Sequence, residues 1–275
     1  MAFVDTLGAR FLGLVRYPDA LAALLFRAVW AIWRDRDLGQ RAFVRQVTQQ
    51  VYFTGVQAIT PVMVLALTVG SLSVIQGVSG IGIVADPEDF GRLVTVVVMR
   101  DVAPLLTSGV VIVRSVTAVA AELAVMKVQR EVEALDVMGV SAFRYLVAPR
   151  LIGGIIAYFG LSVAFNTTAL AGGLFAGSLL LSIPSGELLA AVLGSVKPIE
   201  IIAFGVRVVL GGGGMFLIAC FHGLAVGRSQ TEIPPAVSRA SIHALVLVVL
   251  LQSGVSALLV LRAPPPILDV FQGVL

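Results

Sequence analysis

Apolar residues fill five long stretches of the chain, separated by short polar segments. The stretches cover about 52–75, 93–121, 151–183, 199–227 and 240–261. A hydrocarbon core of about 30 Å needs roughly 20 apolar residues in one helix, so each stretch is long enough to cross a membrane. The pattern predicts an all-α polytopic membrane protein with five transmembrane helices, in one five-span domain over 46–262.

Residues 1–45 follow a different pattern, in which Arg and Asp alternate with Leu, Phe and Trp. Pro18 and Asp19 are typical of a helix start. Apolar residues then recur at helical spacing at Leu21, Leu24, Leu25, Ala28 and Ile32. Trp30 and Trp33 suit the lipid headgroup zone. We predict an amphipathic helical region in the membrane interface; a short soluble helical arm is the alternative.

Composition and charge agree with a membrane protein and indicate its orientation. The chain is 58% hydrophobic and 13% charged, whereas soluble domains carry about 25% charged residues. With a cytoplasmic amino terminus, 13 of the 19 Lys and Arg residues lie in cytoplasmic segments and three on the opposite side. Because basic residues favour the cytoplasmic side, five spans place the carboxyl-terminal tail, 263–275, outside.

The segment 123–139, between the second and third stretches, is charged but rich in helix-forming residues. Val128, Val132, Leu135 and Met138 recur at spacings of four, three and three, which gives one apolar edge. The other side is polar, with Lys127, Arg130, Glu131, Glu133 and Asp136. Gly139 is a natural helix stop. The edge is typical of a helix that docks in a partner's groove; the alternative is that it packs on the protein's own spans.

Charged residues inside the apolar stretches are candidate site residues. Each costs several kcal/mol in lipid unless it is paired or hydrated. Arg100 and Asp101 are adjacent and do not share a helix face, so we expect them to pair with other groups or flank a cavity. Arg114 follows Arg100 by close to four helical turns and lies near the same face. Arg207 is a possible partner of Asp101. A network that only fixes helix packing is the alternative.

Other features narrow the chemistry. Gly173 and Gly177 form a G-x-x-x-G pattern that permits close helix packing. Neither Lys127 nor Lys197 follows a Gly, so the chain has no phosphate-binding P-loop and any ATP hydrolysis needs a partner. The sequence contains no evident nucleophile–base set, so we do not expect an enzyme.

His222 and His243 lie apart, without Cys or carboxylate companions, so we expect no metal site. The single Cys220 excludes an internal disulfide.

Over roughly residues 45–260 the sequence resembles the MlaE permease family, which includes the YrbE permeases of Mce systems and a chloroplast lipid-import permease. The strongest block consists of Arg100-Asp-Val-Ala-Pro-Leu-Leu, Arg114, Ala121-Glu-Leu-Ala-Val-Met-Lys, Glu133-Ala-Leu-Asp-Val-Met-Gly-Val and Arg144-Tyr-Leu-Val-Ala-Pro-Arg150. A weaker block is Cys220-Phe-His-Gly, followed by Ser238-Arg-Ala-Ser.

The resemblance implies a subunit of a lipid-transporting ABC complex in the bacterial inner membrane. Such permeases form homodimers with an interfacial amino-terminal helix and five spans per copy. Two cytoplasmic ATPase subunits, which bind ATP and Mg, dock below, and a hexamer of MCE-domain subunits sits on the periplasmic side. The complex moves phospholipid between the inner and outer membranes. No cofactor on this chain itself is implied.

The resemblance also implies residue roles. The segment 123–139 matches the coupling helix that docks in the ATPase. Arg100 and Asp101 match an Arg-Glu pair at the family's lipid cavity, Arg207 falls at a basic position, and Arg114 and Glu122 complete the expected polar network. Departures are Asp101 in place of Glu, Val113 and Val116 in place of Gly, and a missing acidic residue near Ser256. An ion-coupled transporter that uses Asp101 and Glu200, or a membrane scaffold without a substrate path, are the alternatives.

Overall fold

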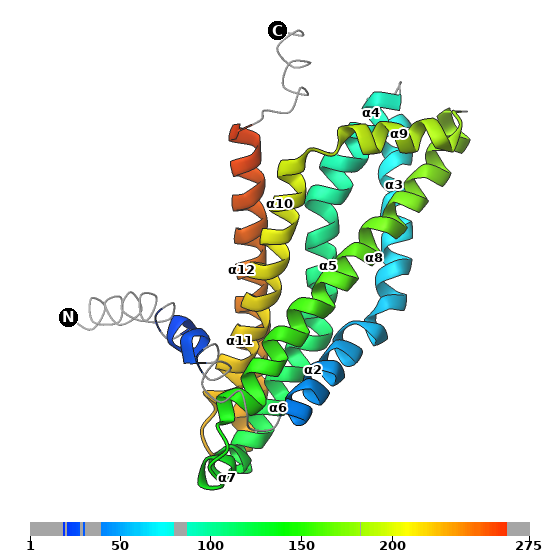
Figure 1. Cartoon of the computed structure of the whole chain (residues 1–275). Helices are drawn as coiled ribbons and strands as arrows, with labels where there is room; N and C mark the ends of the chain where they lie inside the picture. Colours follow the sequence, from blue (N-terminus) through cyan, green and yellow to red (C-terminus); the bar gives the residue numbers. More distant parts are fainter. Residues whose placement is uncertain are drawn as a thin grey trace, which may run out of the picture. The chain divides into compact units, whose positions relative to one another are not determined.

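A computed structural model of the chain describes residues 19, 21–27, 30, 40–79, 87–181 and 183–262. Within these residues every regular element is helical (Figure 1). Five helical runs are long and apolar enough to cross a membrane: Gln40–Gly77, Pro87–Val128, Phe143–Leu181, Pro198–Leu224 and Gln230–Arg262. The predicted all-α fold with five membrane-spanning helices is therefore confirmed.

Most of the helical runs extend beyond the apolar stretches that predicted them. The first begins at Gln40, twelve residues before the predicted start at Tyr52, and the last begins at Gln230 instead of Ala240. Hydropathy marks only the part of a helix that suits hydrocarbon, whereas backbone hydrogen bonds continue into polar sequence at the ends. Hydropathy therefore located the spans but not their ends.

Only part of the amino-terminal region predicted as an interfacial helix is described. Residues 21–27 are helical, and the Phe26 side chain is exposed. The rest of the predicted region, at 1–18, 20, 28–29 and 31–39, lies outside the described residues, as does the predicted tail 263–275. The interfacial position of this region remains a prediction.

The chain divides into two compact units, and the first combines Met1–Thr54, Ile112–Ile156 and Gly213–Ala244. Its elements are α2 (Gln40–Thr54), η3 (Ile112–Val116), α6 (Thr117–Val128), α7 (Glu131–Val137), η4 (Phe143–Val147), the start of α8 (Ala148–Leu181), α11 (Gly213–Leu224), η6 (Gln230–Glu232) and the start of α12 (Ile233–Arg262). Helices α6 and α11 pack side by side. A methyl group added at Gly223 would lie 2.8 Å from the Ala120 carbonyl oxygen, so the two backbones are nearly in contact.

The second unit combines Gly55–Val111, Ala157–Gly212 and Leu245–Leu275. It contains η1 (Val56–Ala58), α3 (Ile59–Ser79), α4 (Pro87–Arg92), η2 (Leu93–Val102), α5 (Ala103–Val111), most of α8, α9 (Ser185–Ser195), α10 (Pro198–Arg207), η5 (Val208–Gly212) and the end of α12. Helices α4 and α9 lie side by side. A buried apolar cluster that includes Phe90, Val94 and Leu188 joins α4, η2 and α9.

Close packing of α3 on α8 organises this second unit. A methyl group at Gly172 would lie 2.6 Å from the Leu67 carbonyl oxygen, and one at Gly70 would collide with the Ala169 carbonyl. The Ser71 hydroxyl also donates a 3.0 Å hydrogen bond to the Gly172 carbonyl. Small residues allow such an approach between membrane helices, where packing and hydrogen bonds drive association.

Four segments, η2, η3, η4 and η5, are π-helical. The π-helix is rare and is frequently found at functional sites, because its wider turn displaces the side chains from their α-helical positions. Segment η2 carries Arg100 and Asp101, and η5 directly follows Arg207. The π-helical turns thus coincide with charged residues of the predicted site.

Candidate functional site

Three charged residues and one serine form a polar cluster in the second unit. Arg100 and Asp101 come from η2, Arg207 ends α10, and Ser256 lies in α12. The Asp101 carboxylate lies 3.9 Å from Arg100 Nε and 3.9 Å from Arg207 Nη2. Arg207 Nη1 also donates to the Arg100 carbonyl. We refer to Arg100, Asp101, Arg207 and Ser256 as the polar cluster.

Ser256 is the centre of this cluster. Its hydroxyl accepts a 2.8 Å hydrogen bond from Arg207 Nη2 and donates one to Asp101 Oδ1. Its backbone carbonyl accepts a 2.8 Å bond from Arg100 Nη2. Ser256 was not predicted as a site residue. The only signal in the sequence was that an acidic residue expected near this position is missing.

The charges in the cluster are unbalanced, and part of their hydrogen-bonding capacity is unused. Two guanidinium groups face one carboxylate, which leaves a net charge of about +1 if all three are ionised. The side chains of Arg100 and Arg207 are 8% and 4% exposed, whereas that of Asp101 is 44% exposed. Within the described chain, Arg100 Nε and Arg207 Nε have no hydrogen-bond partner. The cluster is therefore suited to an anionic group such as a phosphate, which forms charge-assisted hydrogen bonds with Arg.

The adjacency of Arg100 and Asp101 had led us to expect that their side chains face apart. That expectation was incomplete, because the two charged groups lie 3.9 Å from each other. Segment η2 is π-helical, so the angular step between neighbours differs from that of an α-helix. Arg207 does lie near Asp101, at the same distance.

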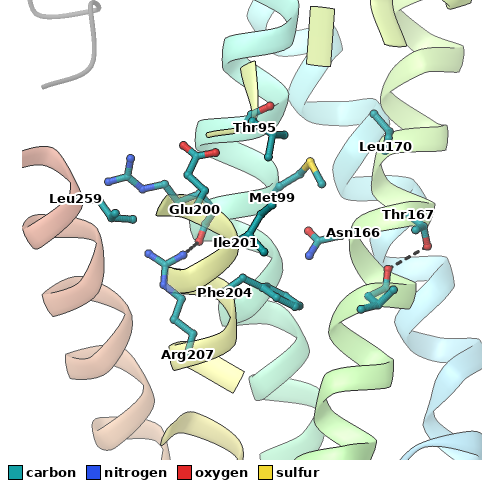
Figure 2. A pocket seen from close by; sticks show the side chains of 13 residues that line it. Thr95, Met99, Asn166, Thr167, Leu170, Glu200, Ile201, Phe204, Arg207 and Leu259 are labelled. Atoms are coloured by element: carbon teal, nitrogen blue, oxygen red, sulfur yellow. Dashed lines mark hydrogen bonds between the residues drawn. The ribbon is translucent and has the colours of Figure 1, made fainter. Parts of the chain in front are cut away.

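Two pockets adjoin the polar cluster in the second unit. The first, which we name the apolar pocket, has a volume of about 300 Å³ and is lined by residues that include Thr95, Met99, Asn166, Ile201, Phe204 and Arg207 (Figure 2). The second, the charged pocket, has a volume of about 510 Å³ and is lined by residues that include Glu88, Arg92, Lys197 and Glu200. Arg100, Glu200 and Leu259 line both pockets. Ligand pockets typically measure about 300–1,000 Å³, so each is large enough for part of a ligand.

The structure divides the predicted polar network between the two units. Arg114 lies in η3 and Glu122 in α6, both in the first unit, whereas Arg100, Asp101 and Arg207 belong to the second. Glu122 Oε1 forms a 2.9 Å ion pair with Arg150 Nη2 of α8. The ion-pair partner that the structure gives Glu122 is thus Arg150, and its place in a network with Arg100 stays a prediction. Arg150 itself was not predicted as a site residue.

The segment predicted as one helix over 123–139 consists of two helices. Helix α6 ends at Val128 and α7 begins at Glu131, because Arg130 adopts a left-handed conformation with φ of 61°. That conformation costs a non-glycine residue roughly 1–2 kcal/mol, and nothing in the sequence signals it. Lys127 Nζ crosses the break to lie 3.4 Å from Glu133 Oε1.

Gly139 ends α7, as its position in the sequence predicts. Its φ is 74°, a conformation that glycine adopts without steric cost. The Gly139 N–H donates to the Asp136 carbonyl at 3.0 Å, and the Val140 N–H donates to the Leu135 carbonyl at 2.9 Å. These two bonds form a Schellman motif, which satisfies the last carbonyls of the helix.

One part of the predicted apolar edge of this segment is buried against the protein, and the other part is exposed. Val132 is buried, and Val128 packs against a cluster of Ala124, Val226 and Ala236, so this part of the edge contacts the protein itself. At the end of the edge Met138 is instead 67% exposed, and the adjacent Val137, which is not part of the predicted edge, is 88% exposed. The free apolar surface thus lies at the end of α7, next to the exposed charges of Glu131, Glu133 and Asp136.

The remaining predicted positions are also located. A methyl group on Gly173 would lie 3.5 Å from Val74 Cγ2, an ordinary contact, whereas one on Gly177 would lie 2.7 Å from the Phe90 ring. The expectation that His222 and His243 lie apart is wrong, because α11 and α12 bring His222 Nε2 within 2.8 Å of His243 Nδ1. Sequence separation does not report contacts between packed helices. In the described part of the chain, no three His, Cys, Asp or Glu residues gather at a possible metal site.

Comparison with known proteins yields one family. The model of the family described as Permease MlaE matches residues 47–258. Similar proteins include the intermembrane phospholipid transport system permease protein MlaE of Haemophilus influenzae, 24% identical over 247 residues that cover 90% of this chain and 93% of that protein. A probable ABC transporter permease protein of Rickettsia felis is 23% identical, with the same coverage of 90% and 93%. The chloroplastic protein TRIGALACTOSYLDIACYLGLYCEROL 1 of Arabidopsis thaliana is 23% identical over 74% of this chain and 58% of its own length.

Proposed function

This chain belongs to the MlaE permease family, and from that premise we propose that it moves phospholipid between two membranes. It is a multi-pass membrane protein and the permease subunit of an ABC transporter for lipids, and ATP hydrolysis belongs to a separate subunit. The observation that carries the proposal is the family match over 47–258, which includes all five membrane-spanning runs in whole or in part.

The polar cluster is the proposed contact for the lipid headgroup. A phosphodiester carries one negative charge, and the cluster offers two buried guanidinium groups that share one carboxylate. The Nε atoms of Arg100 and Arg207 are buried and have no hydrogen-bond partner among the described residues, so they would serve as donors for phosphate oxygens that enter the cluster. Apolar side chains around the cluster suit acyl chains. This role goes beyond the family match and requires its own test.

The end of α7 is the proposed docking point for the ATPase. Val137 and Met138 form an exposed apolar surface, and the neighbouring Glu131 and Glu133 supply negative charge for basic residues of the partner. The break at Arg130 separates α7 from α6, so α7 is a distinct short helix that a partner could contact. Movement of the ATPase would reach the membrane helices through α6.

The assembly and its orientation follow from the family and are also proposals. We infer a homodimer in the bacterial inner membrane, with the amino terminus cytoplasmic and a hexamer of MCE-domain subunits on the periplasmic side. The excess of basic residues in the segments assigned to the cytoplasm supports this orientation. The chain itself would bind no cofactor, and ATP and Mg would bind the partner.

The headgroup role is tested by lipid retention. The complex with the ATPase is purified with Arg100→Ala, and the phospholipid that co-purifies is quantified by mass spectrometry. Arg239→Ala, which alters a helix-bound Arg in the other unit, is the matched control. We expect the Arg100 variant to lose bound phospholipid and the control to retain it. Full retention in Arg100→Ala would remove the headgroup role.

The docking role is tested by assembly. Glu133→Lys reverses a charge of α7, whereas Glu187→Lys makes the same change on α9 in the other unit. We expect the first variant to lose ATPase subunits during purification and the second to keep them. Equal assembly of both variants would show that α7 does not hold the ATPase.

A further inference from the structure

Two of the π-helical segments, η2 and η4, are each followed by an Ala-Pro pair, which begins at Ala103 or at Ala148. In both cases the Ala N–H donates a π-helical hydrogen bond to the carbonyl five residues back, that of Val98 in η2 and that of Phe143 in η4. The next bond of this kind would need an N–H from the proline, which has none. Each proline therefore prevents its π-helical segment from extending further.

The proline after η2, Pro104, also changes the backbone that carries the polar cluster. In an α-helix the residue at this position would donate to the Arg100 carbonyl, four residues back. Pro104 has no N–H, and a proline ring also clashes with the carbonyl four residues before it. Arg207 Nη1, from α10, donates to the Arg100 carbonyl instead. Membrane helices tolerate proline where a neighbouring helix satisfies the freed backbone group, as Arg207 does here.

The bond to the Arg100 carbonyl helps to fix the orientation of the Arg207 guanidinium. Nη1 donates to this carbonyl, and Nη2 donates a 2.8 Å hydrogen bond to the Ser256 hydroxyl. Because the guanidinium is planar and rigid, two bonds at different nitrogens set both its plane and its direction. They therefore also set the direction of Arg207 Nε, which has no hydrogen-bond partner within the described ranges.

A buried tyrosine of α8, Tyr158, holds the proline turn in place. Its hydroxyl donates a 3.2 Å hydrogen bond to the Pro104 carbonyl, and its side chain is fully buried. A methyl group on Gly211, in the segment η5 that directly follows α10, would lie 3.8 Å from the Tyr158 ring. The ring thus packs beside the segment that follows Arg207 while its hydroxyl binds the turn that follows Arg100.

We propose that Pro104 is a positioning residue for the proposed anion-binding group of this transporter. The N–H that proline lacks leaves the Arg100 carbonyl free to accept from Arg207, and this bond holds the Arg207 guanidinium in the orientation that receives a phosphate. An Ala at position 104 would supply the missing N–H, return the Arg100 carbonyl to its own helix and release one end of the guanidinium. The proposal rests on the proposed function, because the positioned group is the proposed headgroup contact.

Lipid binding by three variants separates the missing N–H from the proline ring. The complex with its ATPase is titrated in micelles with phosphatidylglycerol that carries a fluorophore on one acyl chain, and the Kd is obtained from fluorescence anisotropy. Pro104→Ala adds an N–H. The α-hydroxy acid analogue of alanine at position 104, introduced by nonsense suppression, has the same methyl side chain but an ester oxygen in place of the N–H. Pro149→Ala changes the buried proline that follows η4 in the first unit and is the matched control.

We expect Pro104→Ala to raise the Kd about ten-fold, which corresponds to about 1.4 kcal/mol, and the other two variants to stay within about two-fold of the unmodified complex. Because Ala is a better helix former than proline, a weaker helix would not explain the loss. Pro104→Val adds the same N–H and replaces Pro104→Ala if that variant does not fold. An unchanged Kd in Pro104→Ala beside a loss in Arg100→Ala, or an equal loss in the hydroxy acid analogue, would overturn the proposal.

A double-mutant cycle without added lipid distinguishes failure of this proposal from failure of the proposed function. Pro104→Ala and Arg207→Leu are compared, singly and together, by equilibrium unfolding. Two residues that act on one hydrogen bond are not additive, so we expect a coupling of about five-fold in the unfolding equilibrium constant. Additive effects would overturn the positioning of Arg207, whatever the transport activity. Coupling together with unchanged phospholipid binding in both Arg100→Ala and Pro104→Ala would uphold the placement of Arg207 by Pro104 and remove the headgroup role.

Discussion

Replacement of Ser256 by Ala tests whether the polar cluster is held together through this one hydroxyl. Ser256 Oγ accepts from Arg207 and donates to Asp101, so the substitution removes two hydrogen bonds to charged groups. Such bonds contribute about 1.5–3 kcal/mol each. Bonds between membrane helices average only about 0.6 kcal/mol in measured cases, with a maximum near 1.7. The Arg100 bond to the Ser256 backbone carbonyl survives in Ala. We therefore expect a loss of about 1–3 kcal/mol in the free energy of unfolding.

The assay is equilibrium unfolding in mixed micelles, followed by far-ultraviolet circular dichroism. Ser253→Ala is the matched control, since Ser253 lies in the same helix but is exposed. Exposed substitutions of this kind usually change stability by less than about 0.5 kcal/mol. Ser256→Ala should also bind less phospholipid, because Arg207 and Asp101 are no longer held in place. Equal stability of the two variants would refute the role assigned to Ser256.

Three further predictions concern the rest of the structure, and each is measured by the same unfolding assay. Gly70→Ala forces a methyl group into the Ala169 carbonyl and should lower the free energy of unfolding by about 1–3 kcal/mol. In the control Gly109→Ala the methyl group meets open space, so the free energy of unfolding should stay the same or rise by up to about 1 kcal/mol. Gly139→Ala places a side chain at a φ of 74° and should cost about 1–2 kcal/mol through backbone strain alone; no change would contradict the left-handed cap. Glu122→Gln removes the charge that pairs with Arg150 and should lower the free energy of unfolding by only about 1 kcal/mol, because Glu122 is 62% exposed. Glu131→Gln is the control, and equal effects of the two variants would exclude the pair as a stabilising contact.

The membrane-spanning helices were predictable because hydrocarbon imposes a length and a polarity on every helix that crosses it. The end of α7 was also predictable, since only Gly139 in that segment adopts a positive φ without cost. The break at Arg130 was not, because arginine is an ordinary helix former. Its left-handed conformation is imposed by the chain around it rather than by its own preference.

Residues that act through packing were the hardest to predict. Ser256 is one of several small polar residues in an apolar helix, a pattern that most often indicates local hydrogen bonding to the preceding turn. Its role emerges only when α12 meets η2. The charged residues Arg100, Asp101 and Arg207 were easier to predict. A charge within a membrane span is costly unless it is paired or hydrated, so it indicates a polar site.

The most direct test of the account is phospholipid transfer in proteoliposomes that contain this chain and its ATPase. Transfer of isotope-labelled phosphatidylethanolamine to acceptor vesicles is followed with ATP, without ATP, and with an ATPase whose P-loop Lys is replaced. The account predicts transfer only with ATP and the active ATPase. Transfer that an ion gradient drives without the ATPase, or the absence of ATP-dependent transfer, would contradict it.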